Sequence, residues 1–236
     1  MLSYFLQADI ADTVQSGVQT QVMSESLIDM AVKGGWLMIV LAVLSVIAIY
    51  IFGKKWWMIR QASKIDKDFM MDIRDYIHDG KIKSAKTLCG KFDTPVARMV
   101  ESGIDRIGKP LSDIQTAVEN VGNVEVARLE KGLPYLAMIA GGAPMIGFLG
   151  TVIGMVQAFF NMSKAGANID ISLLSGGIYT AMITTVGGLI VGIIAYFGYN
   201  YLTSKVSNVV FQMESSTIEF MDLLDEPQIP QVKEED

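Results

Sequence analysis

The sequence predicts an all-α membrane protein that crosses the bilayer three times. Residues 34–53, 132–163 and 171–204 contain no Asp, Glu, Lys, Arg or His, over 20, 32 and 34 residues respectively. A helix rises about 1.5 Å per residue, and the hydrocarbon core of a bilayer is about 30 Å thick. Each segment is therefore long enough for a transmembrane helix, and we expect the third helix to extend well beyond the bilayer.

Composition favours an integral membrane protein and argues against an enzyme. The chain has 236 residues, of which 51% are hydrophobic, with 22 Gly and 15 Met. Such values with three long apolar segments are typical of membrane proteins. The single cysteine excludes a disulfide framework. Between the first and second uncharged segments we find no nucleophile–base pair, metal-ligand cluster or phosphate-binding loop. We therefore expect no catalytic residue, cofactor, metal or nucleic-acid partner.

The distribution of basic residues sets the expected orientation. Of 19 Lys and Arg residues, 15 lie between Lys54 and Lys131. The positive-inside rule makes this segment cytoplasmic. Trp36 and the pair Trp56–Trp57 bracket the first uncharged segment, where aromatic side chains mark the two membrane interfaces. The N-terminus is then expected outside the membrane and the C-terminus in the cytoplasm.

These signals divide the chain into seven expected segments. They are an external tail with a short amphipathic helix (1–33), a first span (34–53), a cytoplasmic helical domain (54–131), a second span (132–163), a short external loop (164–170), a third span (171–204), and a cytoplasmic helical extension with a disordered acidic tail (205–236). Thr94 before Pro95 predicts a helix N-cap with a first-turn proline. Ser112 is predicted to cap the next helix, whose inward apolar face includes Val118 and Val124.

The second and third spans each carry a small-residue stripe, with small side chains recurring every three or four positions. Small faces let helix backbones approach closely in lipid, where no hydrophobic driving force holds helices together. The residues assigned to helix packing are Gly147, Gly154 and Ala158 in the second span and Gly177, Ala181, Gly188 and Gly192 in the third. We expect these stripes to join copies of the chain into a homo-oligomer.

Four threonines, Thr151, Thr180, Thr184 and Thr185, lie inside the uncharged spans. One interpretation is packing alone, because a threonine in a membrane helix often bonds back to its own helix carbonyl. The other is a polar path, because hydroxyl and carbonyl oxygens suit a hard cation or a hydrated proton. At about 100° per residue, Thr180 points about 140° away from Thr185, so the two need not serve one surface. Any titrating group on such a path would come from a partner.

Two segments resemble the signature of the MotA/TolQ/ExbB proton-channel family: GFLGTVIGMVQAF (147–159) and LLSGGIYTAMITTVGGLIVGIIAYFGYN (173–200). The three-span topology and the position of the cytoplasmic segment resemble ExbB or TolQ more than the four-span flagellar stator subunit. The segments KGGW, DYIHDGK and ARMVESGIDRIG are most similar in sequence to ExbB proteins of the Bacteroidetes type. The resemblance covers nearly the whole chain except its two ends.

This resemblance implies a homopentamer in the lipid of a bacterial inner membrane, with a periplasmic N-terminus. The pentamer would surround single-span ExbD-like helices that carry a proton-binding Asp, and would energise outer-membrane transport through a TonB-like protein. Thr151 in GTVIG and Thr185 in TTVGG match the family's ion-pathway threonines. Thr180 and Thr184 are left as pathway or helix-contact residues.

One departure from the family keeps several alternatives open. Many relatives carry a Glu where this chain has Thr180. Added hydroxyls are oxygen ligands for a hard cation, so sodium coupling stands beside proton coupling. A TolQ-like role in envelope maintenance, another five-to-two motor, and a passive scaffold also remain as interpretations.

Overall fold

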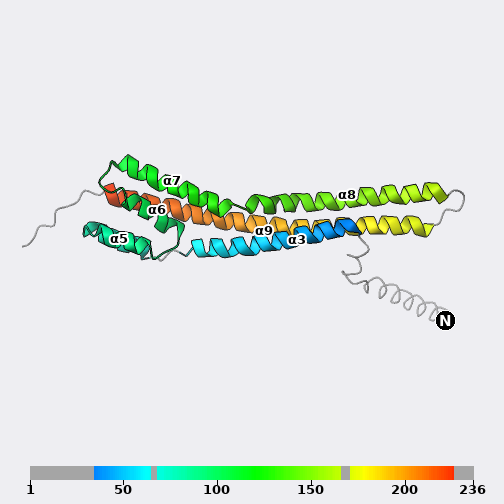
Figure 1. Ribbon diagram of the computed structural model, residues 1–236, viewed down its shortest axis with the longest axis horizontal. Helices are drawn as coiled ribbons and strands as arrows, with labels where there is room; N and C mark the ends of the chain where they lie inside the picture. The colour runs from blue at the N-terminus through cyan, green and yellow to red at the C-terminus, as the bar shows by residue number, and fades with distance from the viewer. Residues whose placement is uncertain (1–34, 65–67, 166–170, 226–236) are drawn as a thin grey trace, which may run out of the picture. The chain divides into compact units, whose positions relative to one another are not determined.

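The computed structural model describes residues 35–64, 68–165 and 171–225. Regular structure in these residues is entirely helical, in seven helices (Figure 1): α3 (Trp36–Ala62), α4 (Phe69–His78), α5 (Ile82–Cys89), α6 (Pro95–Ile104), α7 (Leu111–Glu130), α8 (Leu133–Ala165) and α9 (Ile171–Asp225). Three helical segments, which include α3, α8 and α9, are long and apolar enough to cross a membrane. In the described residues, the prediction of an all-α protein with three helices able to span a membrane is confirmed. The predicted N-terminal amphipathic helix lies outside the described residues.

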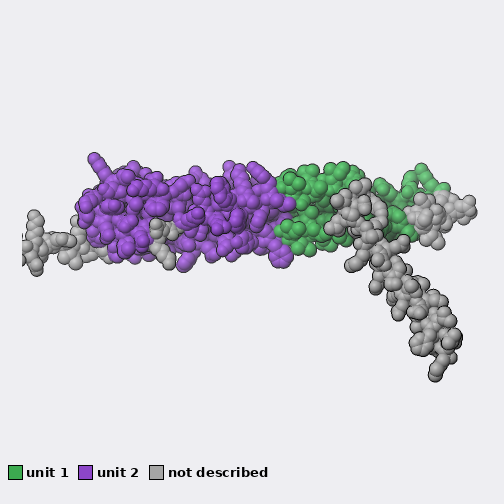
Figure 2. All heavy atoms as spheres, turned by 90° about the horizontal axis from the view of Figure 1, so that it is seen from below, with its two compact units in different colours: residues 1–47, 139–194 green, residues 48–138, 195–236 purple. Residues whose placement is uncertain are grey.

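The chain divides into two compact units, which Figure 2 shows in green and purple. Within the described residues, unit 1 comprises 35–47, 139–165 and 171–194, and unit 2 comprises 48–64, 68–138 and 195–225. The divisions fall inside α3, α8 and α9, so each of these helices contributes residues to both units.

Unit 1 consists of three apolar helical segments. Its part of α8 lies alongside its part of α9, as Figure 1 shows, and α3 packs against both. Leu37 of α3 lies against Gly150 of α8, and Met38 contacts α9 at Gly187. Leu41 is almost fully buried in this unit. The contact between α8 and α9 positions the predicted threonines and is described below.

Unit 2 packs short helices against the second half of α9. The 55-residue α9 continues without a break past Ser204, as the predicted helical extension requires. Its buried positions in this unit include Val206, Val209, Met213, Phe220 and Leu223. Its partner surface comes from α6 and α7. A side chain on Gly103 of α6 would overlap the ring of Phe220, so this glycine leaves room for the aromatic ring.

Local signals fix some helix ends and mislead at others. The Thr94 hydroxyl accepts a hydrogen bond from the Ala97 amide at 3.3 Å, with Pro95 in the first turn, so the predicted cap of α6 is confirmed. The predicted cap at Ser112 is wrong. The helix α7 begins at Leu111, one residue before Ser112, with Pro110 in the N-cap position.

The inward face of α7 also differs from the prediction. Val124 is 61% exposed, whereas its neighbour Glu125 is only 4% exposed. The buried positions Ile114, Val118, Gly122, Glu125 and Leu129 follow intervals of four, four, three and four residues. That spacing defines one helical face, and it selects Glu125 over Val124. A prediction from hydrophobicity alone therefore assigned Val124 to the inward face in place of Glu125.

Candidate ion-pathway site

The two small-residue stripes meet each other inside one chain, where α8 packs against α9. A Cβ added to Gly188 would lie 2.6 Å from the carbonyl oxygen of Ala143 and 2.9 Å from the Cα of Gly147. A Cβ on Gly147 would lie 2.9 Å from the carbonyl oxygen of Thr184. The neighbours are backbone atoms, so any side chain at either glycine would force the two helices apart.

The contact continues along both helices with the same residue types. A Cβ on Gly154 would approach the Cβ of Ala181 to 2.7 Å, and one on Gly177 would approach the Cβ of Ala158 to 2.7 Å. Gly192 faces the Pro144 ring, where an added Cβ would lie 2.5 Å from Cγ. Every stripe residue assigned to packing therefore lies at the α8–α9 contact.

This placement changes the predicted role of the stripes. They were expected to join copies of the chain, whereas the structure shows them joining α8 to α9 within one copy. Sequence spacing defines a small face on a helix but does not name the helix that covers it. The two helices are consecutive in the chain, and their small faces pack against each other.

The structure brings two of the predicted threonines together at this contact. The Thr185 hydroxyl donates to the carbonyl oxygen of Gly147 at 3.0 Å and lies 3.4 Å from the Thr151 hydroxyl oxygen. The Thr151 hydroxyl donates to the carbonyl oxygen of Phe148 at 2.5 Å in its own helix. Both threonines are partly exposed. The pair forms a small polar point between two uncharged helices.

The hydrogen bonds of this pair decide what it can bind. Each hydroxyl has one hydrogen and two acceptor lone pairs. The Thr151 hydrogen is directed to the Phe148 carbonyl, and the Thr185 hydrogen is shared between the nearer Gly147 carbonyl and the Thr151 oxygen. The free capacity of Thr151 and Thr185 is therefore for accepting hydrogen bonds. Such oxygens suit a protonated carboxyl, a protonated water or a metal cation, and they do not favour a bare carboxylate.

The other two threonines are placed differently. Thr184 is only 2% exposed, and its hydroxyl donates to the carbonyl oxygen of Ala181 at 2.7 Å, with Gly147 more distant at 3.5 Å. A Cβ on Gly150 would overlap this threonine, which therefore packs tightly against α8. Thr180 lies five residues before Thr185 on α9 and is half-buried. The structure thus groups Thr184 with the helix contact and leaves Thr180 apart from the hydroxyl pair.

Unit 2 holds a charged network that sequence reasoning missed. The carboxylate of buried Glu125 accepts hydrogen bonds from Arg98 at 2.7 Å and from Arg128 at 3.0 Å. Arg98 also pairs with Asp93. Burial lowers the pKa of Arg98, but the hydrogen bond and charge of Glu125 outweigh it and hold that pKa above its usual value. This network joins α6 to α7, and the four-residue spacing of the α7 face was the signal for it.

A second buried charge lies at the junction between the end of α7 and the start of α8. Lys55 of α3 is 7% exposed, and its ammonium group donates to the carbonyl oxygens of Arg128 at 3.0 Å and Leu129 at 3.2 Å. These carbonyls end α7, since Gly132 adopts a φ of +100° and breaks the helix. A cation at a helix C-terminus is favourable because the last carbonyls lack helical donors. The sequence showed Lys55 only as one of many orienting charges.

Comparison with known proteins agrees with this architecture. Residues 91–215, more than half of the chain, match the MotA/TolQ/ExbB proton channel family. A biopolymer transport protein ExbB homologue of Methanothermobacter thermautotrophicus is 26% identical over 190 residues, which cover 80% of this chain and 67% of that protein. An ExbB-like protein of Synechocystis is 26% identical over 183 residues, with coverage of 77% and 72%.

A third relative is a TolQ protein. The Tol-Pal system protein TolQ of Haemophilus influenzae is 30% identical over 131 residues, which cover 56% of this chain and 57% of TolQ. The fold and site describe a multi-pass helical membrane protein with a polar contact between two uncharged helices. The chain belongs to the MotA/TolQ/ExbB proton channel family. It is a channel subunit without enzymatic activity, as the sequence predicted.

Proposed function

We propose that this chain is the ion-driven motor subunit of a bacterial inner-membrane complex that energises TonB-dependent outer-membrane transport. Family membership and its ExbB-type relatives support the class of function. The working partner would be an ExbD-like protein with one membrane span and an Asp in that span. A TonB-like protein would carry the resulting motion to the outer membrane, and the proton motive force would drive it.

The Thr151–Thr185 pair is the observation that carries this proposal. The spans 132–163 and 171–204 have no Asp, Glu, Lys, Arg or His, so this chain supplies no carboxyl or imidazole group there to carry a proton. The pair offers acceptor oxygens and no spare donor. A partner Asp moving through lipid is costly as an anion and much less so when protonated. Thr151 and Thr185 would accept a hydrogen bond from the protonated acid and so stabilise that state.

We further propose that five copies assemble around the partner helices, with periplasmic N-termini and cytoplasmic C-termini. Because the small-residue stripes are used within the chain, copies would meet through the exposed apolar faces of the same helices. These faces include Val152 and Val156 on α8 and Met182, Val186 and Ile193 on α9. The 15 basic residues between Lys54 and Lys131 support the orientation.

The direct test is reconstitution with an ExbD-like protein that has one membrane span and an Asp in that span. We expect the two proteins to co-purify, native mass spectrometry to give five copies of this chain, and proteoliposomes to pass protons only when the partner Asp is intact. Cells lacking this chain should lose TonB-dependent uptake and regain it on complementation. Proton flux through the chain without any partner would refute the division of labour proposed here.

A TolQ-like role in envelope maintenance is the second candidate, and the TolQ relative at 30% identity supports it. The two roles predict different defects. A deletion strain that keeps TonB-dependent uptake but becomes sensitive to detergent and leaks periplasmic proteins would favour the TolQ-like role. Loss of uptake with an intact envelope would favour the ExbB-like role.

The coupling ion is a separate point, raised by Thr180. We propose that protons are used and that Thr180 is a helix or subunit contact, because it stands apart from the Thr151–Thr185 pair. Thr180→Val should then leave uptake unchanged in sodium-rich and sodium-depleted media, and a protonophore should abolish uptake in both. A sodium requirement that disappears on this one substitution would instead make Thr180 an ion ligand.

A further inference from the structure

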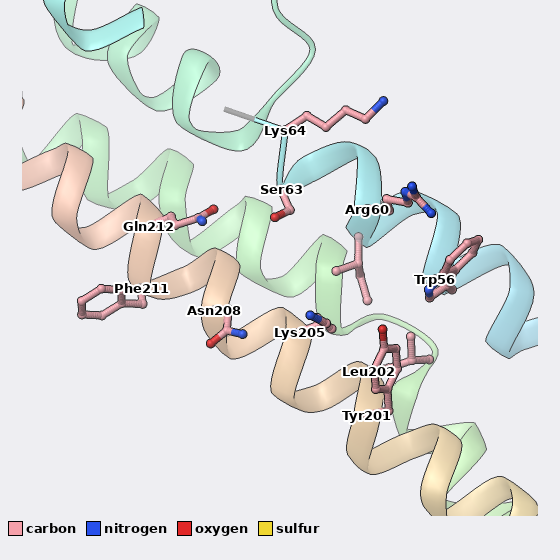
Figure 3. A pocket seen from close by; sticks show the side chains of 11 residues that line it. Trp56, Arg60, Ser63, Lys64, Tyr201, Leu202, Lys205, Asn208, Phe211 and Gln212 are labelled. Carbon is pink, nitrogen blue, oxygen red and sulfur yellow. The ribbon is translucent and has the colours of Figure 1, made fainter. Parts of the chain in front are cut away.

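Unit 2 contains a cavity of about 680 Å³ between the end of α3 and the middle of α9 (Figure 3). The helix α3 supplies Trp56 and Arg60 to its lining, the segment just after it supplies Lys64, and α9 supplies Tyr201 and Lys205. Figure 3 shows Arg60 beside Trp56, and Lys205 and Tyr201 on the facing helix. Two separate helices thus bring basic and aromatic side chains to one space.

The cavity carries positive charge that the described residues do not neutralise. No acidic side chain is among its described lining residues. The Arg60 guanidinium lies 5.2 Å from the centre of the Trp56 ring, and the Lys205 ammonium lies 5.7 Å from that of Tyr201. Cations over aromatic faces are held in place yet keep their charge available. Elsewhere in unit 2, basic side chains such as Lys86 pair with carboxylates. This cavity is therefore suited to an anion from outside the chain.

The cavity also has an unused hydrogen-bond acceptor. The side-chain oxygen of Gln212 is buried, and it receives no hydrogen bond from the described residues. Asn208 and Ser63 lie in the same lining. A buried polar atom without a partner is costly, so a ligand that supplies a donor here gains free energy. A headgroup that combines an anionic phosphate with a hydroxyl group would satisfy both the basic side chains and Gln212.

The position along the chain indicates where such an anion would come from. Trp56 follows the uncharged segment 34–53 by only three residues. Tryptophan at the end of a span marks the level of the lipid headgroups, and basic pockets at that level bind anionic lipids. A neighbouring cavity of about 510 Å³ shares Trp56, Arg60 and Lys64 and adds Lys91, together with Asp93, whose carboxylate pairs with Arg98.

We propose that this cavity binds the headgroup of an anionic phospholipid of the phosphatidylglycerol type. Arg60 and Lys205 contact the phosphate, Lys64 adds charge at the mouth, and Gln212 accepts a hydrogen bond from a headgroup hydroxyl. The lipid then links the end of α3 to α9 at the membrane surface. This inference depends only on the chain lying in a membrane, so it stands or fails separately from the proposed motor function.

The test is lipid binding by the purified full-length protein in neutral detergent micelles. Phosphatidylglycerol, phosphatidylcholine and inorganic phosphate are titrated separately, and bound lipid is counted by native mass spectrometry. The test variant is Arg60→Gln with Lys205→Gln. The matched control is Lys54→Gln with Lys83→Gln, which removes the same charge from exposed positions of unit 2 that do not line the cavity. Circular dichroism checks that both variants keep their helix content.

We expect the wild-type protein and the control to prefer phosphatidylglycerol over phosphatidylcholine. The Arg60/Lys205 variant should bind phosphatidylglycerol roughly tenfold or more weakly, since each basic residue near the surface attracts an anionic lipid. If the cavity variant cannot be purified, Gln212→Leu replaces it and should lose several-fold in affinity. Equal affinity in the cavity and control variants overturns the proposal. Displacement of the lipid by millimolar inorganic phosphate would also overturn it, in favour of a soluble anion.

Discussion

The α8–α9 contact of unit 1 and the α6–α7–α9 core of unit 2 are both made by packed helices, but they are built from different residues. In unit 1 the helices touch through backbone atoms at Gly147 and Gly188, and the polar side chains that bond across the contact are threonine hydroxyls such as that of Thr185. In unit 2 a large side chain such as Phe220 fills the core, and buried Glu125 is held by two arginines.

This difference follows from the solvent expected around each unit. In lipid no hydrophobic effect drives apolar side chains into a core. Helices therefore associate through close van der Waals contact, which requires small residues. Water drives large apolar side chains into a core and can solvate the rim of an ion network. A charged side chain in the unit expected to face lipid would cost much free energy. The polar side chains that pair there, Thr151 and Thr185, are uncharged.

The largest expected effect comes from filling the backbone contact of unit 1. Gly188→Leu should cost about 3 kcal/mol or more, because its Cβ would meet Ala143 and Gly147 backbone atoms that cannot move aside. Gly176→Leu is the matched control on the same helix, since a Cβ there meets no described atom within 4 Å. Thermal unfolding in micelles, followed by circular dichroism, measures both. Similar unfolding temperatures would show that α8 and α9 are not held as described.

Breaking the ion network of unit 2 should have the next largest effect. Glu125→Ala leaves Arg98 and Arg128 without their shared carboxylate and should cost about 3 kcal/mol. Exposed Glu130→Ala on the same helix is the control and should change stability by less than about 0.5 kcal/mol. Denaturant titration in micelles gives both values. Removing the buried pair together, with Arg98→Met and Glu125→Met, should recover part of the loss, and no recovery would contradict the buried-pair account.

Removing the lysine that ends α7 should have a smaller effect. Lys55→Met keeps the length of the side chain but leaves the Arg128 and Leu129 carbonyls without their donor, at a cost of about 1–3 kcal/mol. Lys54→Met, one residue earlier and exposed, is the control. Protease cleavage near Gly132 should quicken in the first variant only. Equal cleavage of the two variants would mean that Lys55 does not hold this junction.

The sequence predicted the architecture well, because its signals are local or strongly periodic. Three uncharged segments gave the spans, and Thr94 with Pro95 gave a helix start. The intervals of three and four residues identified the stripes on both helices. The sequence does not predict which other part of the chain packs against each helix face. The stripes meet within the chain, Glu125 is buried in place of Val124, and Lys55 reaches carbonyls 73 and 74 residues away in sequence. The partners of the stripes and of Lys55 leave no periodic mark in the sequence, whereas the burial of Glu125 does match the spacing of the α7 face.

The smallest expected effect is on the reactivity of the Cys89 thiol. Its labelling rate reports whether the core of unit 2 is closed, and no substitution is needed. Burial raises the pKa of this thiol to about 12. At pH 8 only about one thiol in 10⁴ is then ionised, and the reactive form is the thiolate. Maleimide labelling in micelles should therefore be slow at pH 8, become faster as pH rises, and become fast on denaturation in SDS. Rapid labelling of the folded protein would show that the α4–α5–α6 region is open.

The most direct measurement of the central claim compares valine with serine at Thr151 and Thr185. Valine keeps the shape and removes the hydroxyl, whereas serine keeps the hydroxyl that accepts the hydrogen bond. If the pair stabilises a partner's protonated acid, the double valine variant should assemble normally yet lose energised uptake by tenfold or more. The double serine variant should retain most of it. Full TonB-dependent uptake by correctly assembled double valine protein would contradict the account and leave the two threonines with a packing role alone.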